Sequence, residues 1–324
     1  MEIAKALLMV GGAGEHVPWP SAPTPKALFP VGNRPILFRH LESLSAAGVL
    51  ETVILSDSSA SVPIRSAVGD GQRWGMRVRH LEWTPADGLA GALRVGHEDG
   101  FGEPVLVQHG GSLVRERMHP HISAFAREQL DALALYGAGS ASPSDLGYLL
   151  SARAVSILRD AAGAVNPLAG VREQGGRVRE QRVDACLPSH GGLQDLLESN
   201  RRVLEDLESS VEPGSLDATT IQGTVQVHPT ARVERSLLRG PLVIGPGAVI
   251  SDAYIGPYTS IGAGVVMEGT EIEYSIVLPE AELRFVGARL ESSVIGRGAR
   301  VVRAFELPGA MRMSVGDGAE VILR

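Results

Sequence analysis

A glycine-rich turn near the start of the chain, with one lysine downstream, offers the residue types that hold a phosphate. Gly11, Gly12 and Gly14 follow the apolar run of residues 6–10, and Lys26 follows a proline-rich stretch. Glycines let the backbone approach a ligand with its N–H groups exposed, and a lysine adds positive charge. The spacings match neither the dinucleotide-binding nor the Walker pattern. The turn therefore predicts phosphate binding, with a plain strand-to-helix connection as the alternative.

Four further residues could transfer protons. Glu15 and His16 stand directly after the turn, His109 ends a short apolar run, and His190 lies between a proline-serine pair and two glycines. Histidines that converge on one cleft indicate acid–base chemistry near neutral pH, with a zinc-type site as an alternative. A third interpretation gives them no role, because nine histidines are spread over the chain.

The elements that must position these residues alternate between strands and helices. Apolar or alternating runs predict strands at residues 6–10, 53–56, 78–83 and 105–108, and amphipathic segments predict helices at 35–47, 61–68 and 89–98. This rhythm favours a three-layer α/β domain with a mainly parallel sheet. Ligands of such sheets bind beyond the carboxyl ends of the strands, where the glycine-rich turn and His109 are expected to lie.

The period of the apolar residues changes after residue 221. An apolar residue recurs every sixth position, with turn glycines close by, at Val243, Val249, Ile255, Ile261 and Met267. This spacing is typical of a hexapeptide β-helix, in which each repeat forms one face of a triangular coil and its apolar residue points inward. The predicted division is an α/β domain over residues 1–211, a linker over 212–220 and a β-helix over 221–324.

The composition indicates an ordinary globular protein. The 324 residues are 44% apolar and 21% charged, and the formal charge is −7. Lysine and arginine are outnumbered and scattered, so neither nucleic acid nor an anionic membrane is an expected partner. The chain has no apolar run of about eighteen residues, the length that a membrane span requires, and no secretory signal is evident. A single cysteine fits a reducing compartment, and we expect a cytoplasmic protein.

The glycine-rich turn and the run after it resemble the signature loop of sugar-1-phosphate nucleotidyltransferases, GGxGTRLxPxT…PKxLxPVxNxPIL. The matching stretch, residues 7–37, reads LLMVGGAGEHVPWPSAPTPKALFPVGNRPIL. The runs GDGQRWGMRVRHLEWTPADGLAGAL at 69–93 and SLLRGPLVIGPGAVISDAYIGPYTSIG at 236–262 are similar to those of long-form glucose-1-phosphate thymidylyltransferases. The resemblance implies a Rossmann-like nucleotidyltransferase domain followed by a left-handed hexapeptide β-helix. It also implies self-association, and we expect a homo-oligomer.

Several positions that this family uses for phosphate and magnesium carry other residues here. Glu15 and His16 replace the threonine and arginine of the loop, Gly111 aligns with the aspartate of the family's LGDNL strand, and Ser189 aligns with its second metal aspartate. No counterpart of the family's EKP motif is present. A glycine cannot ligate a metal, and magnesium is normally held by carboxylates together with substrate phosphates. No metal-binding residue is therefore predicted.

The turn that lies against the nucleotide base in the family, GLAQ, is only partly kept. Gly88 is present, but Gly91 stands where the family has the glutamine that would hydrogen-bond thymine. The selection of a thymidine nucleotide thus loses its expected polar partner.

Two functional hypotheses follow. In the favoured one, the chain has lost magnesium-dependent synthesis of sugar nucleotides. Its old pocket then either runs acid–base chemistry or only binds a small ligand, phosphorylated or nucleotide-like, without a cofactor and within a sugar or natural-product pathway. The predicted catalytic residues are Glu15, His16, His109 and His190, and the predicted ligand-binding residues are Gly11, Gly12, Gly14, Lys26, Gly88 and Ser189. In the alternative, the chain is an active, magnesium-dependent sugar-1-phosphate nucleotidyltransferase in which other carboxylates, such as Asp87, Asp145 or Asp184, compensate.

Overall fold

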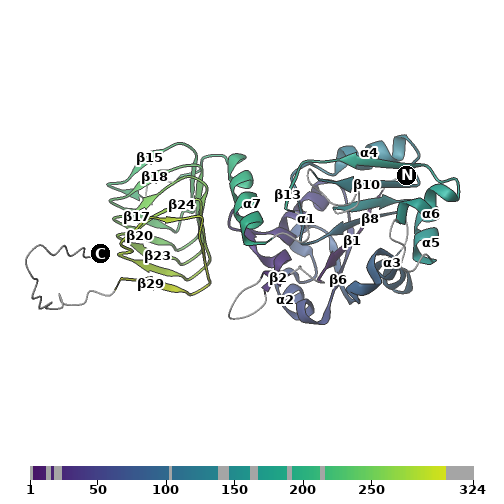
Figure 1. Ribbon diagram of the computed structural model, residues 1–324, viewed down its shortest axis with the longest axis horizontal. Helices are drawn as coiled ribbons and strands as arrows, with labels where there is room; N and C mark the ends of the chain where they lie inside the picture. Colours follow the sequence, from purple (N-terminus) through teal and green to yellow (C-terminus); the bar gives the residue numbers. More distant parts are fainter. Residues whose placement is uncertain are drawn as a thin grey trace, which may run out of the picture.

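The protein has an α/β domain and a stack of β coils, with one helix, α7, between them (Figure 1). The computed structural model describes residues 3–11, 16–17, 24–101, 104–137, 146–160, 167–187, 192–211 and 216–303. No helix in these ranges is long and apolar enough to cross a membrane.

A seven-stranded sheet forms the centre of the α/β domain, in the order β12-β10-β11-β8-β1-β6-β7. Its strands are β1 (Lys5–Val10), β6 (Glu51–Ser56), β7 (Arg77–Glu82), β8 (Val105–His109), β10 (Ala132–Tyr136), β11 (Gly147–Leu150) and β12 (Val178–Arg182). Only β11 runs antiparallel to its neighbours in this sheet. The expectation of a mainly parallel sheet is confirmed.

Helices cover both faces of the sheet, which makes the domain three-layered. They are α1 (Ile36–Ala46), α2 (Ser58–Val68), α3 (Gly88–Glu98), α4 (His119–Arg127), α5 (Ala152–Asp160) and α6 (Pro167–Glu173). The helix α7 (Leu193–Glu205) lies at the junction with the β coils (Figure 1), and the 3₁₀ turns are η1 (Lys26–Leu28), η2 (Gln72–Trp74) and η3 (Pro85–Asp87). Successive residues of a strand point to opposite faces. Accordingly, Leu8 packs in the cluster with α1, α2 and α4, and Leu7 in the cluster with α3, α5 and α6.

Short paired strands surround this sheet. They are β2 (His16–Val17) with β3 (Thr24–Pro25), β4 (Pro30–Val31) with β5 (Arg34–Pro35), and β9 (Leu113–Val114) with β13 (Ala185–Leu187).

The second body is a left-handed β-helix built from three parallel sheets, each with one strand per coil. The first sheet holds β14 (Leu216–Asp217), β17 (Arg232–Glu234), β20 (Val249–Ser251), β23 (Val266–Glu268), β26 (Glu282–Arg284) and β29 (Arg300–Val302). The second holds β15 (Thr220–Gln222), β18 (Leu237–Arg239), β21 (Tyr254–Ile255), β24 (Glu271–Glu273) and β27 (Leu290–Glu291). The third holds β16 (Val225–Val227), β19 (Leu242–Ile244), β22 (Thr259–Ile261), β25 (Ile276–Val277) and β28 (Val294–Ile295).

The coils depart from a strict six-residue repeat. Ile250 pairs with Val233 one coil earlier and with Met267 one coil later, so a coil here has 17 residues. The step from Ile250 to Ile255 is therefore five residues, and both side chains are buried. The expectation that Val249 points inward is wrong, since that side chain is 45% exposed and Ile250 takes the inward place.

The β-helix is packed onto the α/β domain through α7. One apolar cluster contains Phe29 and Val31 of the signature stretch, Leu196 and Leu197 of α7, and Ile276 of β25. The two domains therefore share part of their core.

Candidate functional site

Gly11, the first residue of the glycine-rich turn, and the end of β8 lie at one edge of the central sheet. Met9 of β1 is paired in register with His109 of β8, and the N–H of Gly110 donates to the carbonyl of Met9 at 2.8 Å. Gly11 follows β1 and thus begins the turn beside this pair. The carboxyl edge of the sheet brings together the backbone of Gly11 and the backbone of His109, as the strand pattern predicts.

Gly11 is required by its surroundings. Its φ is +114°, a conformation that only glycine adopts readily, and a Cβ at this position would lie 2.4 Å from Oδ2 of Asp57. Asp57 follows β6, the neighbour of β1. Its carboxylate is thus packed directly against the start of the turn.

Asp57 is also fixed by the helix that follows it. Oδ1 accepts hydrogen bonds from the N–H of Ser59 at 3.0 Å and of Ala60 at 2.9 Å, and from Oγ of Ser59 at 2.6 Å. These bonds cap α2, and Oδ2 is the oxygen on the side of Gly11. Sequence reasoning missed Asp57, although an aspartate directly after a predicted strand and before serines signals a helix start.

Lys26 lies in η1 and is 1% exposed. Lysine is seldom buried so completely unless its amine is paired, so the surroundings of this side chain hold it in one place. Two residues upstream, β3 begins and pairs with β2, where His16 stands opposite Pro25. The backbone of His16 therefore lies beside the segment that carries Lys26.

A buried histidine holds the turn at the end of β8. Nε2 of His40, on α1, lies 2.7 Å from the carbonyl oxygen of Ser112, and Oγ of Ser112 donates to the carbonyl of His109 at 2.7 Å. Burial lowers the pKa of His40 below 6.5, although the bond to Ser112 opposes this shift. Because a carbonyl only accepts, Nε2 carries the proton of a neutral ring. No feature of the sequence singles out His40, which looks like any polar residue of an amphipathic helix.

The family resemblance implies a magnesium-binding aspartate at position 111, and no carboxylate stands there. Gly111 follows His109 and Gly110 at this edge and has no side chain with which to bind a cation. In the part of the chain that the structure describes, no group of three or more His, Cys, Asp or Glu side chains could hold a metal ion.

The start of α3 shows why position 91 is a glycine. Gly88 has a φ of +55° and begins α3, and among the described residues no atom outside its own chain neighbours and helix backbone lies within 4 Å of where its Cβ would be. A Cβ on Gly91, by contrast, would lie 2.2 Å from Cβ of Asp87. The glutamine of the family therefore cannot stand at position 91 unless Asp87 moves.

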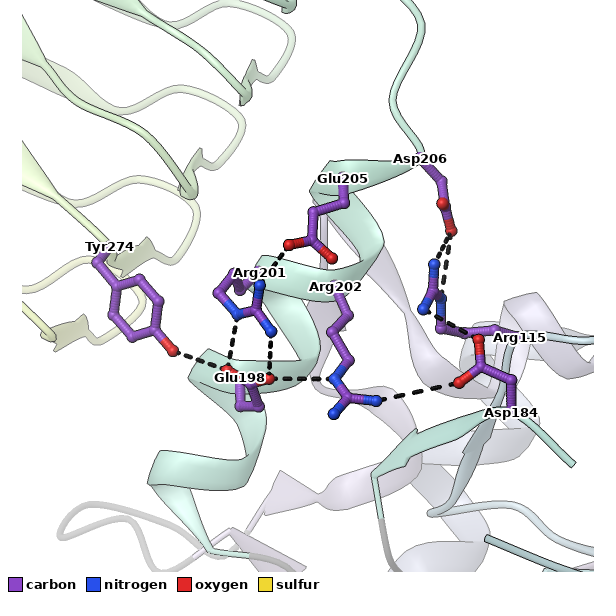
Figure 2. Close-up of polar contacts among 8 residues, drawn as sticks. All are labelled: Arg115, Asp184, Glu198, Arg201, Arg202, Glu205, Asp206 and Tyr274. Atoms are coloured by element: carbon purple, nitrogen blue, oxygen red, sulfur yellow. Dashed lines mark hydrogen bonds and ion pairs between the residues drawn. The ribbon is translucent and has the colours of Figure 1, made fainter. Parts of the chain in front are cut away.

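Other sequence predictions fall elsewhere. The described residues do not include Gly12, Gly14, Glu15, Asp145, Ser189 and His190, or the side chain of His16. Asp184, named as a compensating carboxylate, forms an ion pair with Arg115 at 3.0 Å and belongs to a charged network beside α7 (Figure 2). The described ion pair of Asp184 is thus formed with Arg115, a residue outside the glycine-rich turn.

A cavity of about 970 Å³ lies away from this edge, at the junction of the two domains. Residues of α1, of the segment from β9 to α4 and of α7 line it, and several form ion pairs, such as Arg34 with Glu42 at 2.7 Å. The cavity does not include Gly11, Lys26 or His109.

Known proteins resemble this chain over nearly its whole length. A family model described as nucleotidyl transferase matches residues 5–154. A glucose-1-phosphate thymidylyltransferase of Streptomyces antibioticus is 32% identical, over 98% of this chain and 99% of its own length. One from Streptomyces griseus is 30% identical, over 97% of this chain and 98% of its own.

A solved structure from Bacillus anthracis, described as a glucose-1-phosphate thymidylyltransferase in complex with sucrose, shares the fold. Its TM-score is 0.53, and the match covers 64% of this chain and 97% of that chain at 16% identity. At this identity the likeness concerns the fold alone.

Proposed function

This chain belongs to the nucleotidyl transferase family, and from that premise we propose that it is a sugar-1-phosphate nucleotidyltransferase. In this reaction, a phosphate oxygen of a sugar 1-phosphate attacks the α-phosphorus of a nucleoside triphosphate. The bond to the β-phosphate breaks, and diphosphate leaves. The observation that carries the proposal is the 32% identity to a glucose-1-phosphate thymidylyltransferase over 98% of the chain.

The arrangement at the carboxyl edge of the sheet supports the proposal. Phosphoryl and nucleotidyl transfer depend mainly on positioning and on neutralising charge in the transition state. We assign the positioning to the turn that begins at Gly11, and the charge to the buried Lys26. Gly11 follows β1, which is paired with β6 and β8, and Lys26 follows β3, which is paired with β2.

Because position 111 has no carboxylate, a transferase of this kind needs another carboxylate to bind the cation that accompanies the nucleotide. The carboxylate that the structure sets against the turn is Asp57, which faces Gly11 through Oδ2. We propose Asp57 as the carboxylate that serves this edge, as a partner for a cation carried in by the nucleotide. Magnesium bound to a nucleotide takes one or two protein carboxylates and fills its other positions with phosphate and water.

A second candidate function is ligand binding without nucleotidyl transfer, or different chemistry in the same pocket. The observation that favours it is Gly111, which replaces a carboxylate at the end of β8. Removing one transition-state contact of this kind typically costs about 2.7–4 kcal/mol. Under this candidate, the predicted acid–base residues Glu15, His16, His109 and His190 would act on a different substrate.

Two measurements on the full chain separate these candidates. Release of diphosphate is followed with dTTP or UTP and a panel of sugar 1-phosphates, with and without magnesium, and calorimetry measures the binding of each nucleotide. We expect magnesium-dependent release that is lost in Lys26→Met, a variant that keeps the bulk of the buried chain without its charge. Nucleotide binding without release would contradict transfer and support the second candidate. Absence of both would reject nucleotide chemistry at this edge.

A further inference from the structure

The β-helix is bonded to the segments that lead into the proposed site, and one buried residue of α7 makes the central connection. Oδ1 of Asn200 accepts hydrogen bonds from the N–H of Gly32 at 2.8 Å and from Oγ of Ser260 at 2.7 Å. Its Nδ2 donates to the carbonyl of Tyr258 at 3.0 Å. Asn200 and Ser260 are both 0% exposed. A single amide thus joins α7, the β-helix and the hairpin of β4 and β5.

The hairpin of β4 and β5 makes a second contact with the β-helix at its tip. Gly32 and Asn33 have φ values of +58° and +59°, as a two-residue hairpin turn requires. In this turn Nδ2 of Asn33 donates to the carbonyl of Ile261 at 2.6 Å. Both residues of the tip are therefore connected to the β-helix. Gly32 is connected through Asn200, and Asn33 bonds to the β-helix directly.

This hairpin is continuous with the segment that carries Lys26. The N–H of Phe29 donates to the carbonyl of Lys26 at 2.9 Å, and the N–H of Ile36 donates to the carbonyl of Phe29 at 3.2 Å. Phe29 is 2% exposed and packs in the apolar cluster at the junction with Ile276 of the β-helix. The backbone of Lys26 is thus fixed on one side by contacts that reach the β-helix.

A chain of charged residues connects the β-helix with two other segments (Figure 2). Oη of Tyr274, on the β-helix, donates to Glu198 of α7 at 3.1 Å, and Glu198 pairs with Arg202 at 3.1 Å. Arg202 approaches Asp184 at 3.9 Å, and Asp184 pairs with Arg115 at 3.0 Å.

In Figure 2 the chain of charges reaches Asp184 and Arg115, and Arg115 also pairs with Asp206 at 2.6 Å. Arg115 follows β9, which comes directly after the turn of His109, and Asp184 precedes β13, which leads toward the predicted positions 189 and 190. Hydrogen bonds from Arg201, opposed by partial burial, hold the pKa of Glu198 at about 2, so this carboxylate stays charged at neutral pH.

From these contacts we propose that the β-helix is a positioning element of the catalytic edge, with Asn33 and Asn200 as its positioning residues. The hydrogen bonds to Gly32 and Ile261 would hold the segment of Lys26 in the geometry that transfer requires. This inference rests on the proposed function for its effect on turnover. Its structural part, the ordering of residues 26–36, concerns the protein without any ligand.

The test uses two gentle variants of the full chain, each with a matched control. Asn33→Gly keeps the left-handed turn and removes only the bond to Ile261; its control is Gln129→Gly, at an exposed residue with φ of +50° in the α/β domain. Ser260→Ala removes the donor to Asn200; its control is Ser275→Ala, an equally buried serine whose side-chain bonds to Glu273 and Ser293 lie within the β-helix.

The first readout is hydrogen–deuterium exchange of the amides of residues 26–36 without ligand. Loss of one hydrogen bond, worth about 1 kcal/mol, corresponds to about fivefold faster exchange by local opening. We expect this acceleration in Asn33→Gly and Ser260→Ala, and unchanged exchange in the two controls. Unchanged exchange in both test variants would overturn the inference.

The second readout is the rate of diphosphate release. We expect kcat to fall about fivefold in the test variants while KM changes less than twofold, because the reacting groups are misplaced but the ligand still binds. Equal losses in the controls would mean general destabilisation and would overturn the positioning role. If the wild-type chain releases no diphosphate, the proposed function fails, and hydrogen exchange alone decides whether the β-helix orders residues 26–36.

Discussion

The Nε2 atom of His40 lies 2.7 Å from the carbonyl oxygen of Ser112, inside the turn that closes β8. His40 is 4% exposed, and its ring is neutral because burial lowers its pKa below 6.5. A buried side chain of α1 thus supports the backbone that carries His109. Burial of this ring makes stability sensitive to pH, and the hydrogen bond to Ser112 opposes the effect in part.

Protonation of His40 should destabilise the fold in mild acid. The folded state holds this ring at a pKa below the unfolded value of 6.5, so the stabilisation is complete above pH 6.5 and is lost as the pH falls through the folded pKa. The free energy of unfolding should decrease by up to about 1.4 kcal/mol per pH unit in that window. Urea denaturation between pH 5 and 8 measures the slope. In His40→Gln the slope should be shallower, whereas the exposed His228→Gln should keep it; equal slopes in all three proteins would contradict the prediction.

Asp57 should have separable effects on stability and on turnover. Asp57→Ala removes the cap of α2 and should reduce the free energy of unfolding by about 1 kcal/mol. Asp57→Asn keeps an acceptor for the N–H groups of Ser59 and Ala60 but removes the charge that faces Gly11. We expect near-native stability and at least tenfold slower diphosphate release for the asparagine variant. Equal turnover in Asp57→Asn and the wild type would reject Asp57 as the carboxylate of this edge.

Adding a carboxylate at position 111 should increase transfer. Gly111→Asp supplies a charge at the end of β8, and contacts of this type are worth about 2.7–4 kcal/mol in the transition state. Magnesium-dependent release should rise by about tenfold or more, allowing for strain at a buried position. Gly111→Asn has nearly the same shape without the charge and serves as control. An identical rate in both variants would show that position 111 no longer faces the reacting phosphates.

Position 91 should tolerate a side chain only when Asp87 is also reduced. A Cβ at Gly91 would lie 2.2 Å from Cβ of Asp87, so Gly91→Ala should destabilise the protein by about 1–3 kcal/mol despite the better helix propensity of alanine. In an Asp87→Gly background the clash is absent, and the same substitution should become neutral or stabilising. Thermal melting of the four proteins measures this coupling. Additive effects of the two substitutions would contradict the proposed clash.

Much of the fold could be predicted from the sequence because it depends on patterns that repeat. The alternation of apolar strands with amphipathic helices predicted the parallel sheet, and the helices expected at 35–47 and 89–98 lie at Ile36–Ala46 and Gly88–Glu98. The six-residue period predicted the β-helix, but not that Ile250 would replace Val249 in the interior. That detail depends on the 17-residue coil, which strand pairing reveals and a local apolar pattern does not.

The candidate site was less predictable because it depends on contacts between distant residues. The convergence of Gly11 and His109 followed from strand order. The roles of Asp57 and His40 could not be predicted from strand order. Asp57 acts on Gly11 and His40 on Ser112, and the fold alone brings these distant residues together. The sequence also could not show that Asp184, predicted as a compensating carboxylate, forms an ion pair with Arg115 beside α7. The predicted roles of Glu15, His16, His109 and His190 stay predictions.

The bonds of Asn200 also limit how such a chain can exchange parts during evolution. A recombination point after α7 would join Asn200 to a foreign β-helix without Ser260 and Tyr258. The buried amide of Asn200 would then lose the partners that these two residues supply. A point before α7 would instead separate Asn200 from Gly32. The hairpin tip, α7 and the β-helix should therefore be inherited together, as one unit that cuts across the boundary between the two domains.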